Sequence, residues 1–163
     1  MEPGDRRLAR PPSERWRTPE AAAEEPRPDL ARAVAIGAGA ALLFALGWLL
    51  LAGVLAMDYG IVVAAAAGGW LVGSAVAFGA WASRPHRPRR SLQALAVALT
   101  FGGWLVGNVF DWLWSQALLP GSSLSLPERL AQTPFADWLS GQLSPLTALQ
   151  VGLAVVVSWR SAR

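Results

Sequence analysis

Four long runs without a charged residue dominate this sequence. Residues 33–57, 59–83, 91–110 and 138–159 contain no Asp, Glu, Lys or Arg, and the runs are 25, 25, 20 and 22 residues long. At about 1.5 Å per residue, each run is long enough as a helix to cross a hydrocarbon core of roughly 30 Å. A chain that is 53% hydrophobic and 15% charged is also too apolar for an ordinary soluble domain. The sequence therefore predicts an all-α integral membrane protein.

The predicted architecture is a bundle of four transmembrane helices in a single domain over residues 31–163. Proline, glycine and charged residues set the approximate limits of these helices, which are 33–57, 61–82, 92–114 and 143–159. The turn at Met57-Asp58-Tyr59-Gly60 is so short that the first two helices are expected to form an antiparallel hairpin.

The N-terminal segment, residues 1–30, has a different composition. It contains six prolines, charges of both signs and few large apolar side chains. Such a segment buries too little surface to offset its ordering entropy, which is of order 1 to 2 kcal/mol per residue. We therefore expect a disordered tail.

The connection over residues 115–142 is the longest between the predicted spans. Ser125 with Glu128 forms a capping-box pattern, and Thr133 before Pro134 is a second helix-start signal, so two short interfacial helices are expected. The start of the fourth span is less well defined, because Ser144-Pro145 resembles an N-cap and first helical residue. Either the helix starts near Pro134 and kinks at Pro145, or a short span depends on local thinning of the bilayer.

Arginine asymmetry predicts the orientation. All 14 basic residues are arginine, and thirteen of them lie before the first span (up to Arg32), in the connection between the second and third spans, or at the C-terminus. Only Arg129 lies on the opposite side. The positive-inside rule then places both termini in the cytoplasm, and we expect a cell inner membrane.

A six-residue sequence occurs twice. Gly68-Gly69-Trp70-Leu71-Val72-Gly73 in the second span recurs as residues 102–107 in the third. The two spans run in opposite directions, so the pattern is that of an inverted repeat, although chance or convergent packing is the interpretation we favour. Each copy contains a Gly-x-x-x-Gly ridge that suits close helix packing, within the bundle or across a dimer. The ridge residues are Gly69, Gly73, Gly103 and Gly107.

Asp111 is the one charged residue expected inside a span. A carboxylate near hydrocarbon is costly and is a functional candidate by default. Asn108 lies one turn away, and Ser144, Thr147 and Gln150 form a polar stripe at a comparable depth on the fourth span. In one interpretation these residues form a proton or cation site. In the other, which the sequence favours, Asp111 lies hydrated at the interface beside Trp112 and Trp114, and the polar stripe simply joins helices.

Other chemistry has little support in the sequence. There is no cysteine, and the single histidine, His86, lies in a basic connection without a metal-ligand pattern. No phosphate loop or nucleophile motif is present, so we expect no catalytic residue, metal or cofactor. Four arginines of the basic connection are expected to contact anionic lipid, namely Arg84, Arg87, Arg89 and Arg90.

The leading functional prediction is a non-catalytic structural, accessory or interaction subunit of a prokaryotic inner membrane. The alternative is a small transporter or channel subunit that uses Asp111 as a proton or cation site. The expected partners are the lipid bilayer and either further copies of the chain or another membrane protein. Nucleic acid is not expected, because the basic residues flank membrane spans instead of lining a folded surface.

Overall fold

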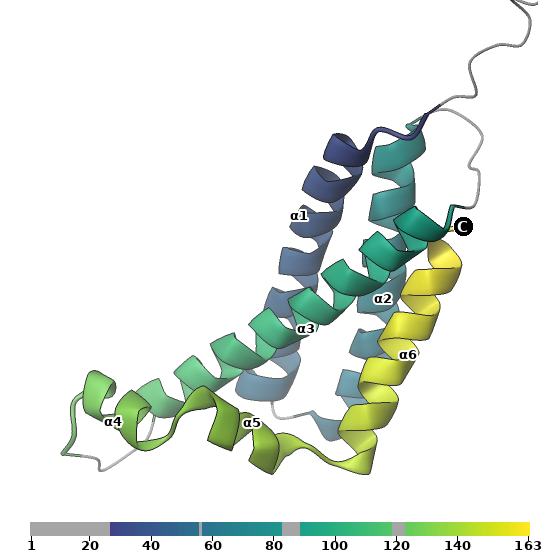
Figure 1. Ribbon diagram of the computed structural model, residues 1–163. Coiled ribbons are helices and arrows are strands. Elements are labelled where there is room, and N and C mark those ends of the chain that lie inside the picture. The colour runs from purple at the N-terminus through teal and green to yellow at the C-terminus, as the bar shows by residue number, and fades with distance from the viewer. Residues whose placement is uncertain (1–26, 56, 83–88, 119–122) are drawn as a thin grey trace, which may run out of the picture.

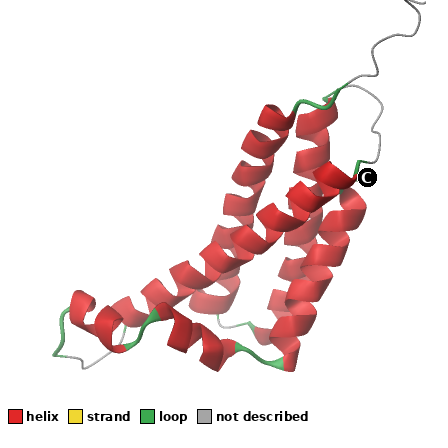
Figure 2. Ribbon diagram, viewed as in Figure 1, coloured by secondary structure: helices red, strands yellow, loops and turns green. Residues whose placement is uncertain are grey.

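The protein is helical throughout the part of the chain that can be described. The computed structural model describes residues 27–55, 57–82, 89–118 and 123–163, and these contain no strand (Figure 2). The all-α prediction is therefore confirmed for these residues. In chain order the elements are α1 (Leu30–Trp48), the π-helix η4 (Leu49–Val54), α2 (Asp58–Trp81), α3 (Arg90–Ala117), α4 (Leu126–Gln132), α5 (Phe135–Gln142) and α6 (Pro145–Ser161).

Three helical segments are long and apolar enough to cross a membrane. They are Leu30–Val54, Gly60–Trp81 and Arg90–Ala117. A fourth is added only if α5 and α6, which meet at 95°, are taken together as one broken span. The structure therefore supports an all-helical protein with three or four candidate spans.

The long helices form a single bundle. In Figure 1, α1, α2 and α6 run side by side, while α3 crosses them obliquely. Both α1 and α6 pack on α2, and α3 packs on α1 and, less extensively, on α6. The short helices α4 and α5 lie at one end, whereas the start of α1, the end of α2, the start of α3 and the C-terminus lie at the other (Figure 1).

The first helical hairpin turns earlier than its sequence predicts. The prediction placed the turn at Met57–Gly60, but α2 begins at Asp58 with Met57 as its N-cap. Before the turn the chain forms η4, in which Leu55 N donates to Leu50 O at 2.9 Å, five residues back. Because this wider helical turn ends the first rod at Val54, the reversal falls before residue 58 and the predicted turn residues become the first turn of α2.

Local capping signals account for the helix starts. Asp29 Oδ1 accepts a hydrogen bond from Arg32 N at 2.9 Å, so α1 begins at Leu30. Asp29 N also donates to Ala80 O at 3.0 Å, which joins the start of α1 to the end of α2. The predicted capping box of α4 is confirmed, since Glu128 Oε2 accepts from Ser125 N at 2.8 Å. The predicted disordered tail lies almost entirely in residues 1–26, outside the described residues.

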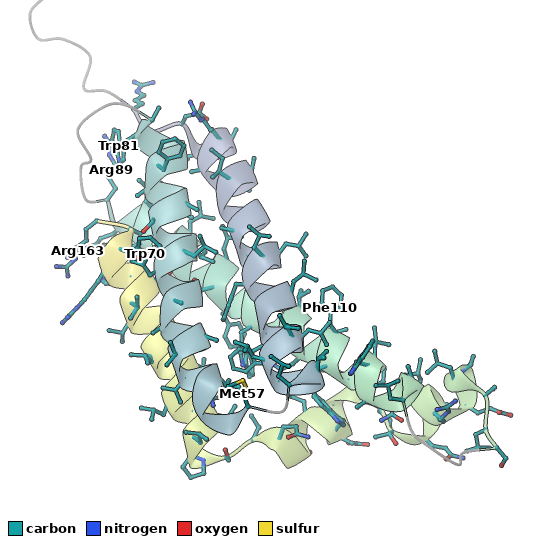
Figure 3. All side chains as sticks on the ribbon, turned by 180° about the vertical axis from the view of Figure 1, so that it is seen from behind. Met57, Trp70, Trp81, Arg89, Phe110 and Arg163 are labelled. Carbon is teal, nitrogen blue, oxygen red and sulfur yellow. The ribbon has the colours of Figure 1, made fainter. Side chains whose placement is uncertain are left out.

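Aromatic and basic side chains gather at the end that holds the C-terminus. The Arg89 guanidinium lies 5.7 Å from the centre of the Trp81 ring, and Arg32 lies at the same distance from Phe78. Figure 3 shows Trp81 and Arg89 together at this end, with Met57 at the opposite end.

Candidate functional site

A polar pocket lies between helices near the α4–α5 end of the bundle. Its volume is about 180 Å³, and it is bordered by residues of α1, η4, α2, α3, α6 and the end of α5. All five residues of the predicted polar site line it, namely Asn108, Asp111, Ser144, Thr147 and Gln150. The remaining lining residues are Trp48, Ala52, Ile61, Gln142 and Leu146.

Asp111 provides the only charge in the lining of this pocket. Its carboxylate lies against Gly53 of η4, where an added Cβ would be 2.7 Å from Asp111 Oδ1. No described residue forms a hydrogen bond or an ion pair with this carboxylate. The pocket therefore holds a negative group whose oxygens are available to a ligand.

Two buried carboxamides lie beside the carboxylate. Asn108 and Gln150 are only 6% and 5% exposed. Asn108 Nδ2 donates to Trp104 O at 2.8 Å within α3, which leaves Oδ1 available as an acceptor. The Gln150 amide forms no hydrogen bond with a described residue. Both groups can therefore offer an oxygen to a ligand in the pocket.

Ser144 and Thr147 build the corner at which α6 begins. Ser144 Oγ accepts from Thr147 N at 3.2 Å, and Thr147 Oγ1 donates to Gln142 O at 2.8 Å. Pro145 follows the cap in the favoured first helical position. These contacts lie at the 95° bend between α5 and α6, and α6 begins at Pro145 as its cap signal predicts.

Trp112, the neighbour of Asp111 in the sequence, contacts the α4–α5 region. Its indole N–H donates to Thr133 O at 3.0 Å, and its ring packs edge-on against Phe135 of α5. The indole therefore anchors α3 to the α4–α5 region. Asp111, one residue earlier on the helix, lines the pocket instead.

Among the described residues, no cationic side chain forms an ion pair with Asp111. The nearest candidate by sequence is Arg129, the arginine that breaks the orientation pattern. Its guanidinium donates to Gln116 O at 2.6 Å and its Nε donates to Leu124 O at 3.0 Å. The Arg129 guanidinium thus satisfies one carbonyl in the last turn of α3, at the negative end of the helix dipole, and a second carbonyl just before α4.

The four ridge glycines lie at helix contacts. Gly69 and Gly73 of α2 face the backbone of α6 at Ala154 and Ser158, while Gly103 and Gly107 of α3 face α1. A Cβ on Gly103 would be 2.8 Å from Ala41 O. The two copies of the repeat nevertheless differ, because Trp70 is 60% exposed and its counterpart Trp104 is 6% exposed.

The predicted lipid-contacting arginines are only partly described. Arg84 and Arg87, like His86, lie outside the described residues, whereas Arg89 stacks on Trp81 and Arg90 is exposed. Among the described residues, no three His, Cys, Asp or Glu side chains are close enough to hold a metal ion.

Sequence reasoning missed several parts of the pocket. Gly53 shapes the space beside Asp111, but it lies in an apolar run with no sign of that contact. Gln142 and Trp48 also line the pocket, although Gln142 could have been included because it is two residues from Ser144. Comparison of the chain with protein-family models, with curated proteins and with solved structures finds no match, so the pocket itself is the basis for assigning a function.

Proposed function

We propose that this protein is a small membrane transporter or channel subunit that binds a proton or a small cation at Asp111. One observation supports this proposal above the others. The carboxylate of Asp111 shares a polar pocket with Asn108 and Gln150, and no described cation neutralises it.

The chemistry of the pocket suits a cation. Carboxylate and amide oxygens are hard ligands that replace the water around a small cation or accept a proton. An anion would meet the charge of Asp111 without a compensating arginine. The expected accessory role, by contrast, gives no reason to keep an unpaired carboxylate beside two buried carboxamides. Absence of catalysis remains a prediction.

The membrane setting is part of the proposal. Large apolar side chains point outward from the helices, including Leu43, Val63 and Trp70, which are 62%, 71% and 60% exposed. Lipid tails are the natural partner for such a surface. We take α6 as the fourth span, because it packs along α2 through the bundle and its 17 residues cover about 25 Å.

The proposed orientation has both termini in the cytoplasm of a cell whose inner membrane holds the protein. The arginine distribution supports it, and the two described ends of the chain lie at the same end of the bundle (Figure 1). The pocket at Asp111 then opens near the outer side.

Flux measurements on the full chain test the proposal. The protein is reconstituted in lipid vesicles, and uptake of H⁺, Na⁺ and K⁺ is measured separately under an imposed gradient. Wild type should carry at least one of these ions faster than protein-free vesicles, and Asp111→Asn should lose that activity. Asp137→Asn is the matched control, because Asp137 is an exposed acid on α5 outside the pocket. Equal flux in wild type and Asp111→Asn would overturn the proposal.

A further inference from the structure

The polar character of the Asp111 pocket continues along the contact between α3 and α6. On α3, the residues Gln93, Thr100, Trp104, Asn108 and Asp111 follow one another at intervals of seven, four, four and three. Such intervals keep side chains on one face of a helix. The buried residues of α6 are Gln150, Ala154 and Ser158, of which two are polar.

Direct hydrogen bonds join the two helices beyond the pocket. Thr100 Oγ1 donates to Ser158 Oγ at 2.9 Å, and the two residues are 1% and 0% exposed. Nearer the C-terminus, Gln93 Nε2 donates to Trp159 O at 3.3 Å. We call these residues the α3–α6 seam. They are Gln93, Thr100, Trp104, Asn108 and Asp111 of α3, with Gln150 and Ser158 of α6.

An unpaired donor lies in the middle of the seam. Trp104 Nε1 is buried and has no hydrogen-bond partner among the described residues. A buried indole N–H without an acceptor is costly, and a water molecule is the usual acceptor at such a position. Trp104 lies one helical turn from both Thr100 and Asn108, so it separates the hydroxyl pair from the pocket.

We propose that the transported ion is the proton and that it moves along the α3–α6 seam between Asp111 and the Thr100–Ser158 pair. This inference rests on the proposed function and specifies its substrate. Asp111 takes up a proton from the pocket, and a water molecule that accepts from Trp104 Nε1 and donates to Asn108 Oδ1 would connect Asp111 to the hydroxyl pair. Each hydroxyl gains one O–H bond as it loses another, and the released proton passes on toward the Gln93 end of the seam, so no oxidation state changes.

Packing is the reason for choosing the proton over a metal ion. Thr100 and Ser158 are sealed from the surface, and Ala154 between the pocket and this pair is only 3% exposed. A hydrated Na⁺ or K⁺ needs a continuous open path, whereas a proton passes through hydroxyls that both donate and accept. The Thr100–Ser158 pair meets the second requirement.

The test separates proton movement from a purely structural role of the seam. H⁺ and Na⁺ fluxes are measured in vesicles for wild type, Thr100→Val, Thr100→Ser and Ser158→Ala, with thermal stability recorded for each. Thr100→Val nearly preserves shape but removes the hydroxyl, and Thr100→Ser restores it. We expect proton flux to be lost in Thr100→Val and Ser158→Ala and retained in Thr100→Ser, with no Na⁺ flux in any of them.

Two results would overturn the inference. Folded Thr100→Val and Ser158→Ala that both keep wild-type proton flux would show that the seam only joins helices. Wild-type Na⁺ or K⁺ flux that depends on Asp111 would show that the ion is not the proton, and in that case the proposed function would stand. Absence of any Asp111-dependent flux would overturn the proposed function as well. Should Thr100→Val fail to fold, Ser158→Ala tests the same hydroxyl pair from α6.

Discussion

The Asp111 carboxylate lies directly against Gly53, where an added methyl group would be 2.7 Å from Asp111 Oδ1. The atom that would have to move is the end of a flexible side chain. Gly53→Ala should therefore displace the carboxylate from its place in the pocket while leaving the fold intact. Ion flux should fall while thermal stability changes by less than about 1 kcal/mol.

A control glycine in α1 separates this effect from helix propensity. Gly47 has nothing within 4 Å of its added Cβ, so Gly47→Ala should leave ion flux unchanged. A loss of flux in Gly47→Ala equal to that in Gly53→Ala would contradict the assignment of Gly53 to the pocket.

The glycine ridges give a second prediction, which concerns stability. An added methyl on Gly69 would collide with the Ala154 backbone, and one on Gly103 would lie 2.8 Å from Ala41 O. Because backbone cannot move aside as a side chain can, Gly69→Ala and Gly103→Ala should each lower stability in detergent by about 1 to 3 kcal/mol. Gly39→Ala and Gly152→Ala, which meet nothing within 4 Å, should be neutral. Equal losses at all four positions would argue against close packing at the ridges.

Topology can be tested with single cysteines, since the chain has none of its own. Ser91 and Ser123 are exposed and lie near opposite ends of α3. In oriented inner-membrane vesicles, an impermeant thiol reagent should label Ser91→Cys from the cytoplasmic side and Ser123→Cys from the other. Labelling of both from one side would contradict the proposed crossing by α3.

The capping box of α4 predicts a dependence on pH. Hydrogen bonds from the Ser125 side chain, and then from its backbone N–H, lower the pKa of Glu128 from its usual value of 4.5. Because the pKa of Glu128 is lowered in the folded state, the ionised Glu128 stabilises the fold at pH values above its usual pKa. This stabilisation is lost as the pH falls through the lowered pKa. An NMR titration should therefore find Glu128 below 4.5, and Ser125→Ala should move it back up. An unchanged pKa in Ser125→Ala would show that the side-chain hydrogen bond does not form in solution.

Much of the helical layout could be predicted from the sequence. Charge-free runs identify long helices because any charge in hydrocarbon is costly, and Ser125 with Glu128 identifies the start of α4 because its two hydrogen bonds are local. The first candidate span ends at Val54 in the π-helix η4, which has no signature in an apolar run such as residues 49–54.

The sequence predicts which residues belong to the candidate site, but it does not predict how they are placed relative to one another. Helical spacing groups Asn108 with Asp111 on one element and Thr147 with Gln150 on another. Whether the two groups face each other depends on the bend before Pro145 and on the tilt of α3, which are tertiary features. The structure brings both groups to one pocket, while the interfacial position of Asp111 that the sequence favours stays a prediction.

Infrared difference spectroscopy of the protein in lipid tests cation binding at Asp111 most directly. Spectra are recorded before and after steps in pH, Na⁺ or K⁺, and the carboxyl bands are compared between wild type, Asp111→Asn and the control Asp137→Asn. If Asp111 binds the ion, at least one step should change a carboxyl band in wild type and Asp137→Asn, and that band should be missing in Asp111→Asn. Identical difference spectra in wild type and Asp111→Asn would contradict a cation site in this pocket.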